Sequence, residues 1–298
     1  MKFAFIARQR SERPSETVRL MCRWLGVSRS GFYVALRRSP SKRFLSHQKL
    51  KLEIRAVHEI SRRRYGAPRV HAELKSHGVS CGHNQVARLM REEGLKAKKA
   101  HRFKVTTNSS HKKAVAPNRL ARSFDVSNRQ MNTAWSADIT YLPTLEGWLY
   151  LAALIDLSSR RIVGWSIDST LEDALTIRAL RMALTTREVG KGAELLHHSD
   201  RGVQYASTEY QSLLSNHSIT PSMSRIGDCW DNAVSESFFA TLKAELVADA
   251  KWASKSQAKR EVTEYLNWYN FDRRHSTLGY LSPAEYEKKM LLASSPAA

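Results

Sequence analysis

Cysteine and long apolar runs are both scarce in this 298-residue sequence. Its three cysteines, Cys22, Cys81 and Cys229, are odd in number, widely spaced and outside any CxxC pair. That pattern predicts a reduced protein with no disulfide framework and no structural zinc. No stretch approaches the roughly 20 consecutive apolar residues of a membrane span, and the opening MKFAFIARQR lacks the apolar core of a secretory signal. We therefore expect a cytoplasmic protein with no membrane partner.

Acidic residues are scarce in the first 130 positions. That segment holds 31 Lys or Arg against 8 Asp or Glu, a net charge of +23, whereas residues 131–298 hold 17 against 20, a net charge of −3. Neutralised phosphates release counterions and give salt-dependent affinity, so this imbalance favours polyanion binding by the front of the chain. A basic tail that only confers solubility is the competing interpretation.

Two segments of the front half have a helix-turn-helix pattern. In SETVRLMCRWLGVSRSGFYVALRR, Ser15 can cap a first helix, Gly26 marks a turn, and a second helix is predicted from about Ser28 to Arg37. The later segment RVHAELKSHGVSCGHNQVARLMREEGL repeats the same residues at the same offsets, beginning at Gly78. We prefer two helix-turn-helix units with DNA contact by at least one of them; plain helical packing modules are the alternative.

Arginines in and near these units are the candidate DNA contacts. The front-half residues that we expect to bind DNA are Arg29, Arg37, Arg62, Arg63, Arg64 and Arg69. The last four lie in RRRYGAPRV, which either clamps phosphate or forms the solvated end of a helix. Residues 96–130 are basic, polar and poor in apolar periodicity, which predicts a linker that is extended or ordered only on DNA.

Residues 131–298 alternate between strand and helix patterns. Runs around Asp138, from Trp148 to about Asp156, and in RRIVGWSIDS predict three strands joined by short turns. EDALTIRALRMALTTREVG then predicts a helix closed at Gly190, AELLHHS a fourth strand, STEYQSLLSNH a helix and ITPSMS a short fifth strand. This order predicts an α/β domain with a mixed sheet and helices on its faces, preceded by the all-α modules.

Three carboxylates lie in patterns that can bring them together. Asp138 is on the first predicted strand, Asp200 ends the fourth, and Glu236 lies in DNAVSESFFATLKAEL, whose apolar residues recur as on one helix face. Such an oxygen-rich pocket suits hard cations such as Mg²⁺. Pairs of these ions, about 4 Å apart, serve phosphoryl transfer. Taken alone, any one of the three acids reads as a solvated surface group.

The contexts of these acids resemble a known family. WSADITYLP at 135–143, HHSDRGVQY at 197–205 and GDCWDNAVSESFFATLKAEL at 227–246 are followed by YNFDRRHSTLGYLSPAEY at 269–286. In this order they resemble the retroviral-integrase-like DDE transposases of bacterial insertion sequences, in the large group whose second open reading frame encodes the catalytic product. The resemblance covers nearly the whole chain, although the His/Cys zinc site of retroviral integrases has no counterpart here.

The resemblance implies an RNase H-like integrase catalytic core. In it Asp138, Asp200 and Glu236 are the catalytic and metal-binding triad, with two Mg²⁺ ions per site and Mn²⁺ as an alternative ion. It also implies a basic residue, Lys243, seven positions after Glu236. The spacing places Lys243 on the helix face of Glu236, so we expect it to bind a DNA phosphate; an ordinary exposed lysine is the alternative.

Other side chains near these motifs have two interpretations each. Trp230 and Asn232 precede the helix of Glu236 and can contact the terminal bases of a DNA end. We place Asn232 among the DNA-binding residues but prefer packing beneath the helix for Trp230. His197 and His198 are left outside the metal site because Mg²⁺ prefers oxygen ligands.

The end of the chain predicts two helices around a basic turn. One helix is expected from about Ser256 to Tyr269 and a short one from Ser282 or Pro283. The intervening residues 273–275 (Arg-Arg-His) either contact the DNA backbone or pack on the catalytic core.

These features predict a DNA transposase in five parts. They are a helix-turn-helix module (1–45), a second helix-turn-helix-like module (46–95), a basic linker (96–130), an integrase-like catalytic core (131–246) and a C-terminal helical extension (247–298). The expected activity is Mg²⁺-dependent cleavage at the terminal inverted repeats of the element and joining of the freed 3′ hydroxyl to another phosphodiester.

The expected partners follow from this reaction. They are the element ends and a target DNA in the bacterial cytoplasm, with the nucleoid, and synapsis of two ends implies at least a dimer. Fusion with, or partnering by, a short upstream-frame product stays open. A nuclease that cuts without joining and a catalytically silent repressor are the alternatives; the basic modules argue against the first and the intact triad against the second.

Overall fold

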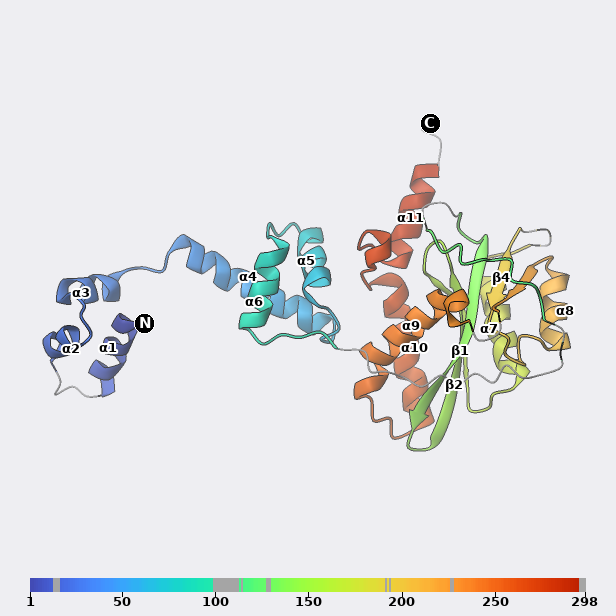
Figure 1. Ribbon diagram of the computed structural model, residues 1–298, viewed down its shortest axis with the longest axis horizontal. Coiled ribbons are helices and arrows are strands. Elements are labelled where there is room, and N and C mark those ends of the chain that lie inside the picture. The colour runs from blue at the N-terminus through green and yellow to red at the C-terminus, as the bar shows by residue number, and fades with distance from the viewer. Residues whose placement is uncertain are drawn as a thin grey trace. The chain divides into compact units, whose positions relative to one another are not determined.

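The computed structural model shows helices in the front of the chain and a mixed sheet in the back half (Figure 1). It describes residues 1–12, 17–98, 113, 115–126, 130–190, 192, 194–225 and 228–294. Internal contacts distinguish two units, Met1–Ala56 and Val57–Ala298. Ser15, the expected helix cap, lies outside the described residues. Among the residues described, no helix has the length and apolarity that crossing a bilayer requires.

The first unit contains three short helices around a small apolar core. They are α1 (Lys2–Glu12), α2 (Val18–Trp24) and α3 (Arg29–Arg37). The core residues, at least one from each helix, are Ile6, Met21, Cys22 and Phe32. The two helices predicted for this segment are confirmed, whereas the sequence pattern missed α1. It also missed α4 (Lys42–Ile60), which crosses the boundary between the two units.

The turn between α2 and α3 recurs in the second unit between α5 (Ala67–Ser76) and α6 (His83–Glu92). The backbone φ is +61° at Gly26 and +76° at Gly78, in the left-handed region that glycine adopts without a steric cost. In each turn the glycine N–H donates to the carbonyl three residues back, and the N–H of the following valine donates to the carbonyl five residues back. Because both turns make this Schellman pair of bonds, the predicted repeat is confirmed.

A five-stranded mixed sheet lies at the centre of the second unit. Its strands are β1 (Ala134–Thr144), β2 (Gly147–Asp156), β3 (Ile162–Asp168), β4 (Leu196–Ser199) and β5 (Thr220–Met223). Their order is β3-β2-β1-β4-β5; the first three are antiparallel, and β4 and β5 run parallel to β1. All five predicted strands and the α/β class are confirmed.

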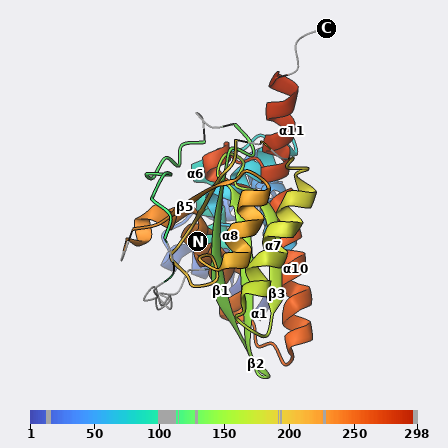
Figure 2. The same cartoon turned by 90° about the vertical axis from the view of Figure 1, so that its right-hand side faces the viewer.

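Helices cover both faces of this sheet. One face is covered by α7 (Asp173–Thr186) and α8 (Thr208–Asn216), which face the viewer in Figure 2, and the other by α9 (Ala233–Glu245) and α10 (Lys255–Phe271). A last helix, α11 (Pro283–Ser294), follows, and short 3-10 turns η1 (Cys229–Asn232), η2 (Val247–Asp249) and η3 (Ser276–Leu278) join the later elements. The helix predicted to close at Gly190 ends earlier, at Thr186.

Strand alternation assigns the residues of β1 to these two faces. Successive side chains of a strand point to opposite sides. Trp135 and Ala137 accordingly join the core beneath α7 and α8. Leu142 joins the core beneath α9 and α10, so Ser136 and Asp138 also lie on the α9 side.

Candidate active site

Asp138 and Asp200 lie on neighbouring strands. Asp138 is in β1, Asp200 directly follows β4, and the two strands pair in parallel up to the residue before each carboxylate. The backbone N–H of Ile139 donates to a carboxylate oxygen of Asp138 at 2.7 Å, and the N–H of Gly202 donates to Asp200 at 2.9 Å. The backbone therefore orients both acids at one end of β4.

Glu236 lies in the first turn of α9, and polar contacts fasten that turn to β1. The hydroxyls of Ser136 and Ser235 are 2.7 Å apart, and the Ser136 hydroxyl also donates to Oδ1 of Asn232. Nδ2 of Asn232 donates to the carbonyl of Ala137 at 3.3 Å. These hydrogen bonds therefore join the residues just before Asp138 in β1 to residues just before Glu236.

Asp138 interacts electrostatically with both of the other acids. Burial raises the pKa of Asp138 well above its ordinary value, and the negative charges of Asp200 and Glu236 raise it further. Burial also raises the pKa of Glu236. Asp138 therefore lies near enough to Asp200 and to Glu236 for their charges to act on it, and a shared metal site of the three carboxylates stays a prediction.

Lys243 lies seven residues after Glu236 in α9, on the same face of the helix, and interacts electrostatically with Asp138. Burial lowers the pKa of its ammonium, and the negative charge of Asp138 acts in the opposite direction. The ammonium in turn lowers the pKa of Asp138. Lys243 is half-buried, and its role as a phosphate contact stays a prediction.

The donor set of this site fits a hard divalent cation. Within the ranges that the structure describes, no three Asp, Glu, His or Cys side chains are already gathered closely enough to hold a metal ion. The carboxylates of Asp138, Asp200 and Glu236 nevertheless supply the oxygen ligands that such ions prefer. Burial and then the charges of Asp200 and Glu236 raise the pKa of Asp138, and a cation bound among these carboxylates would offset that repulsion.

The two histidines before Asp200 have structural partners. Nε2 of His197 lies 2.8 Å from the hydroxyl of Tyr210 in α8, and the ring nitrogens of His198 lie 2.9 and 3.2 Å from the hydroxyls of Ser222 and Ser224. Burial lowers the pKa of His197 to about 3 and that of His198 to about 4. Both imidazoles are therefore neutral and hold β4 to its neighbours.

The residues ahead of α9 differ from their expected roles. Asn232 is 4% exposed and bonded to β1, so the expectation that it contacts DNA is wrong for this structure. Trp230 is 68% exposed, so the preferred interpretation that it packs beneath the helix is also wrong. A buried amide position and an exposed indole cannot be distinguished by local sequence, because both depend on how η1 meets the sheet.

The expected arginine contacts divide into exposed and buried positions. Arg29, Arg37, Arg62 and Arg63 are exposed. Arg64 is 4% exposed, and its guanidinium carbon lies 4.9 and 4.4 Å from the ring centres of two aromatic residues of α10, Tyr265 and Trp268. Phosphate binding by Arg64 is therefore wrong for this structure, because cation–π packing within the fold occupies its charge.

Polar contacts join α5, through Arg69 and Glu73, to the basic turn after α10. The half-buried Arg69 donates from Nε to the carbonyl of Arg274 at 2.9 Å. Arg274 itself donates from Nε to Glu73 of α5 at 2.6 Å and from Nη1 to Glu285 of α11 at 2.9 Å. Arg273 is 2% exposed and pairs with Glu245 of α9 at 2.7 Å. Of the two interpretations of this turn, packing on the core is confirmed.

Part of the predicted linker is ordered against the core. Residues 115–126, named the strap below, place Leu120 with 2% exposure in an apolar cluster with Ala134 and Leu157. Asn118 of the strap donates to Asp231 at 2.8 Å. The expectation that the linker is ordered only on DNA is wrong for these residues, because a buried leucine and polar contacts hold them against the core. Most of the remaining segment 96–130 lies outside the described residues.

Comparisons with known proteins define the class to which this site belongs. A family model described as "Integrase core domain" matches residues 128–229, and a second with the same description matches residues 217–283. An "HTH-like domain" model matches residues 46–103. The protein is thus an integrase-core polynucleotidyl transferase preceded by a helix-turn-helix-like domain.

Relatives along the full chain narrow this class. "Transposase InsF for insertion sequence IS3" of Escherichia coli O111:H- is 39% identical over 294 residues, 98% of this chain and 100% of its own length. A Shigella sonnei protein, "Insertion element IS600 uncharacterized 31 kDa protein", is 41% identical over 270 residues, 90% of this chain and 98% of its own. The chain belongs to the IS3 family of insertion-sequence transposases.

A solved structure is similar in part. The catalytic core domain of HTLV-2 integrase, determined in complex with magnesium, covers 52% of this chain and 95% of its own, with 16% sequence identity and a TM-score of 0.41.

Proposed function

We propose that this transposase binds the terminal inverted repeats of its own insertion sequence, cuts a phosphodiester at each end and joins the freed 3′ hydroxyl to another phosphodiester. The observation that carries this proposal is the placement of the three acids: Asp138 lies in β1, Asp200 directly follows the parallel neighbour β4, and Glu236 lies in the first turn of α9, which is hydrogen-bonded to β1. Water is the nucleophile of the first step and the 3′ hydroxyl that of the second, so no covalent protein intermediate is needed.

The three carboxylates would hold the divalent ions, two Mg²⁺ per site with Mn²⁺ as an alternative. When bound, such ions lower the pKa of the attacking oxygen nucleophile and stabilise the leaving oxygen of an in-line displacement. The chain's own contribution is to keep the ligands in place: the Ser136, Ser235 and Asn232 contacts hold α9 against β1 at the level of the acids. A ligand set held on a strand and a helix needs less reorganisation than one held on loops.

Lys243 is proposed to hold a DNA phosphate beside the triad. Lys243→Ala should lower the rate of strand joining by about 10- to 100-fold, which corresponds to one charge-assisted hydrogen bond of about 1.5–3 kcal/mol. Lys243→Arg should restore part of the rate, because the positive charge is the required property. The measurement is the single-turnover joining rate across DNA concentrations, and an unchanged rate for Lys243→Ala contradicts the role.

The proposed partners are the ends of the element and a target DNA. The proposed location of the protein is the bacterial cytoplasm, in association with the nucleoid. The exposed arginines Arg29, Arg37, Arg62 and Arg63 remain the proposed contacts of the helix-turn-helix regions. Because two ends must be joined, we propose at least a dimer on DNA. Fusion with, or partnering by, a short upstream-frame product is part of the same proposal.

A product analysis with labelled element ends tests this function. Purified full-length protein with Mg²⁺ should yield first a strand shortened at the element end and then a longer, joined strand, and chelation of the metal should abolish both. Cleavage without any joined strand would indicate a nuclease. Binding without cleavage would indicate a repressor. Either result would overturn the proposed transposition chemistry.

A further inference from the structure

Basic residues from the predicted linker lie beside the two catalytic elements. Nζ of Lys113 donates to the carbonyl of Val203 at 3.1 Å, in the loop that begins at Asp200. Further along, the backbone N–H groups of Arg119 and Leu120 donate to the hydroxyl of Ser222 in β5 at 2.9 and 3.3 Å. Lys113 and the strap therefore run along the side of the core that carries Asp200.

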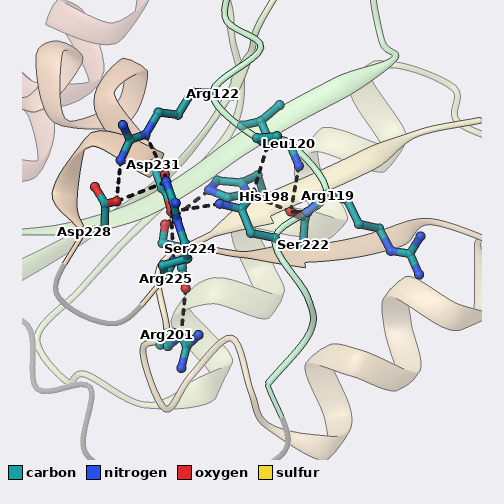
Figure 3. Close-up of polar contacts among 12 residues, drawn as sticks. Arg119, Leu120, Arg122, His198, Arg201, Ser222, Ser224, Arg225, Asp228 and Asp231 are labelled. Atoms are coloured by element: carbon teal, nitrogen blue, oxygen red, sulfur yellow. Dashed lines mark hydrogen bonds and ion pairs between the residues drawn. The ribbon is translucent and has the colours of Figure 1, made fainter.

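The strap is anchored at the start of the helix that carries Glu236 (Figure 3). Asp231, which is 1% exposed, accepts hydrogen bonds from Asn118 at 2.8 Å and from Nε of Arg122 at 2.9 Å. It also accepts from the side chain of Arg225 at 2.9 and 3.0 Å and from the Arg225 backbone at 2.9 Å. These donors lower the pKa of Asp231, so the anchor is ionised at neutral pH.

Positive charge exceeds negative charge along this strip. Its basic side chains are Lys113, Arg119, Arg122, Arg201 and Arg225, and its acidic side chains are Asp125, Asp228 and Asp231. The buried Asp231 is surrounded by its donors, whereas the side chains of Arg122 and Arg225 remain 44% and 57% exposed. The exposed side chain of Arg119 points away from the anchored cluster in Figure 3.

The net charge of the catalytic core explains why these basic residues matter for DNA binding. Residues 131–298 carry a net charge of −3, and the catalytic carboxylates add a local repulsion toward any phosphate that approaches them. A DNA backbone that approaches the triad is therefore favoured by further cations close to it, in addition to those of the core such as Lys243, Arg201 and Arg225. The strap provides them from the basic front half and holds them between the loop of Asp200 and the helix of Glu236.

We propose that the strap, together with Lys113, is a phosphate-binding surface that holds the DNA backbone beside the catalytic carboxylates. This inference rests on the proposed function, because the DNA that it holds is the substrate of the triad. It assigns part of the DNA affinity to a segment packed on the catalytic core, in addition to the helix-turn-helix regions. The alternative is that the strap only stabilises the position of α9 and binds no phosphate, and the experiment must distinguish these two roles.

Arg119→Ala is the most informative variant, because the backbone N–H of Arg119 and not its side chain anchors the strap. Binding of full-length protein to a duplex that carries a pre-cut element end is measured without divalent metal across a salt series. Each lost phosphate contact lowers the slope of log affinity against log salt by about 0.9. We expect that decrease and a several-fold loss of affinity at low salt, with recovery in Arg119→Lys.

Arg181→Ala is the matched control. Arg181 lies on α7, over the face of the sheet opposite α9, and its side chain is 64% exposed. This variant should keep the wild-type slope and affinity, and Lys113→Ala should lower the slope as Arg119→Ala does.

Two outcomes overturn the inference: a wild-type slope and affinity in Arg119→Ala, or an equal loss in Arg181→Ala. If wild-type protein joins ends while Arg119→Ala binds as wild type, the phosphate-binding strap is wrong and the proposed function stands. If Arg119→Ala loses slope while wild-type protein forms no joined product, the proposed function is wrong and the strap stands.

Discussion

The two helix-turn-helix segments share one local turn but have different surroundings. Gly26 and Gly78 adopt the same left-handed conformation and their turns make the same pair of backbone bonds. The first segment packs on α1 around a small apolar core, whereas the second belongs to the unit that contains the catalytic sheet. The local sequence sets the turn, and contacts with distant residues determine what each segment packs against.

Polar contacts over long sequence distances surround the second segment. Tyr65, next to α5, donates to the carbonyl of Asp272 at 3.2 Å and accepts from the backbone N–H of Arg274 at 2.8 Å. Arg64 stacks on α10, and Glu73 pairs with Arg274. Residues 64–73 are thereby joined to the end of α10, which fixes the position of α5 relative to α10.

Removing the buried partner of Arg273 should have the largest effect on stability. Glu245 is 4% exposed and accepts from Arg273 and from the hydroxyl of Tyr265. Glu245→Ala leaves a buried arginine without its counter-charge, which costs about 3–5 kcal/mol. Urea unfolding of the second unit measures the loss.

Glu12→Ala is the control for that experiment in the first unit. Its ion pair with Arg8 has side chains 48% and 77% exposed, and such surface pairs contribute less than about 1 kcal/mol. Equal losses in the two variants would contradict the contrast between a buried joint and a solvated helix surface.

Removing the hydroxyl of Tyr65 should have an intermediate effect on stability, because this hydroxyl bonds to the turn after α10. Tyr65 is 3% exposed, and Tyr65→Phe leaves the N–H of Arg274 without its acceptor at a cost of about 1–3 kcal/mol. Hydrogen exchange of the Arg274 amide should accelerate by a corresponding factor. Unchanged stability and exchange would show that this bond does not hold the two regions together.

The two turn glycines provide the smallest and most closely matched comparison. A Cβ at either position meets no atom within 4 Å, so Gly26→Ala and Gly78→Ala should each cost only the left-handed backbone strain, about 1–2 kcal/mol. Thermal unfolding of each variant measures this. A much larger loss at Gly78 alone would mean that the two turns are not equivalent.

The strands and the three acids were predictable because their signals are local. Aromatic and β-branched residues mark β1, a mainly apolar run marks β2, and the four-residue recurrence of Val234, Phe238 and Leu242 marks α9. The parallel pairing of β1 with β4, which extends to Ala137 and Ser199, then places Asp138 and Asp200 side by side. The resemblance to a family added the roles of these residues, which spacing alone left open.

The misassigned residues depend on distant partners. Arg64 resembles a DNA-binding arginine until Tyr265 and Trp268 fold over it. Asn118 of the presumed linker bonds to Asp231, 113 positions later. Neither pairing leaves a periodic trace in the sequence, because each is made by one side chain from each partner. Charge and composition therefore predicted solvent exposure or DNA contact for residues that the fold places in buried contacts.

The most direct test of the central claim is strand joining by three nearly isosteric variants under one set of conditions. Asp138→Asn, Asp200→Asn and Glu236→Gln replace each carboxylate by an amide, a poorer ligand for Mg²⁺. We predict that each variant binds element ends with wild-type affinity and joins pre-cut ends at least about 100-fold more slowly than wild type. Joining near the wild-type rate by any one of them, with Mg²⁺ and intact DNA binding, would contradict the assignment of the triad.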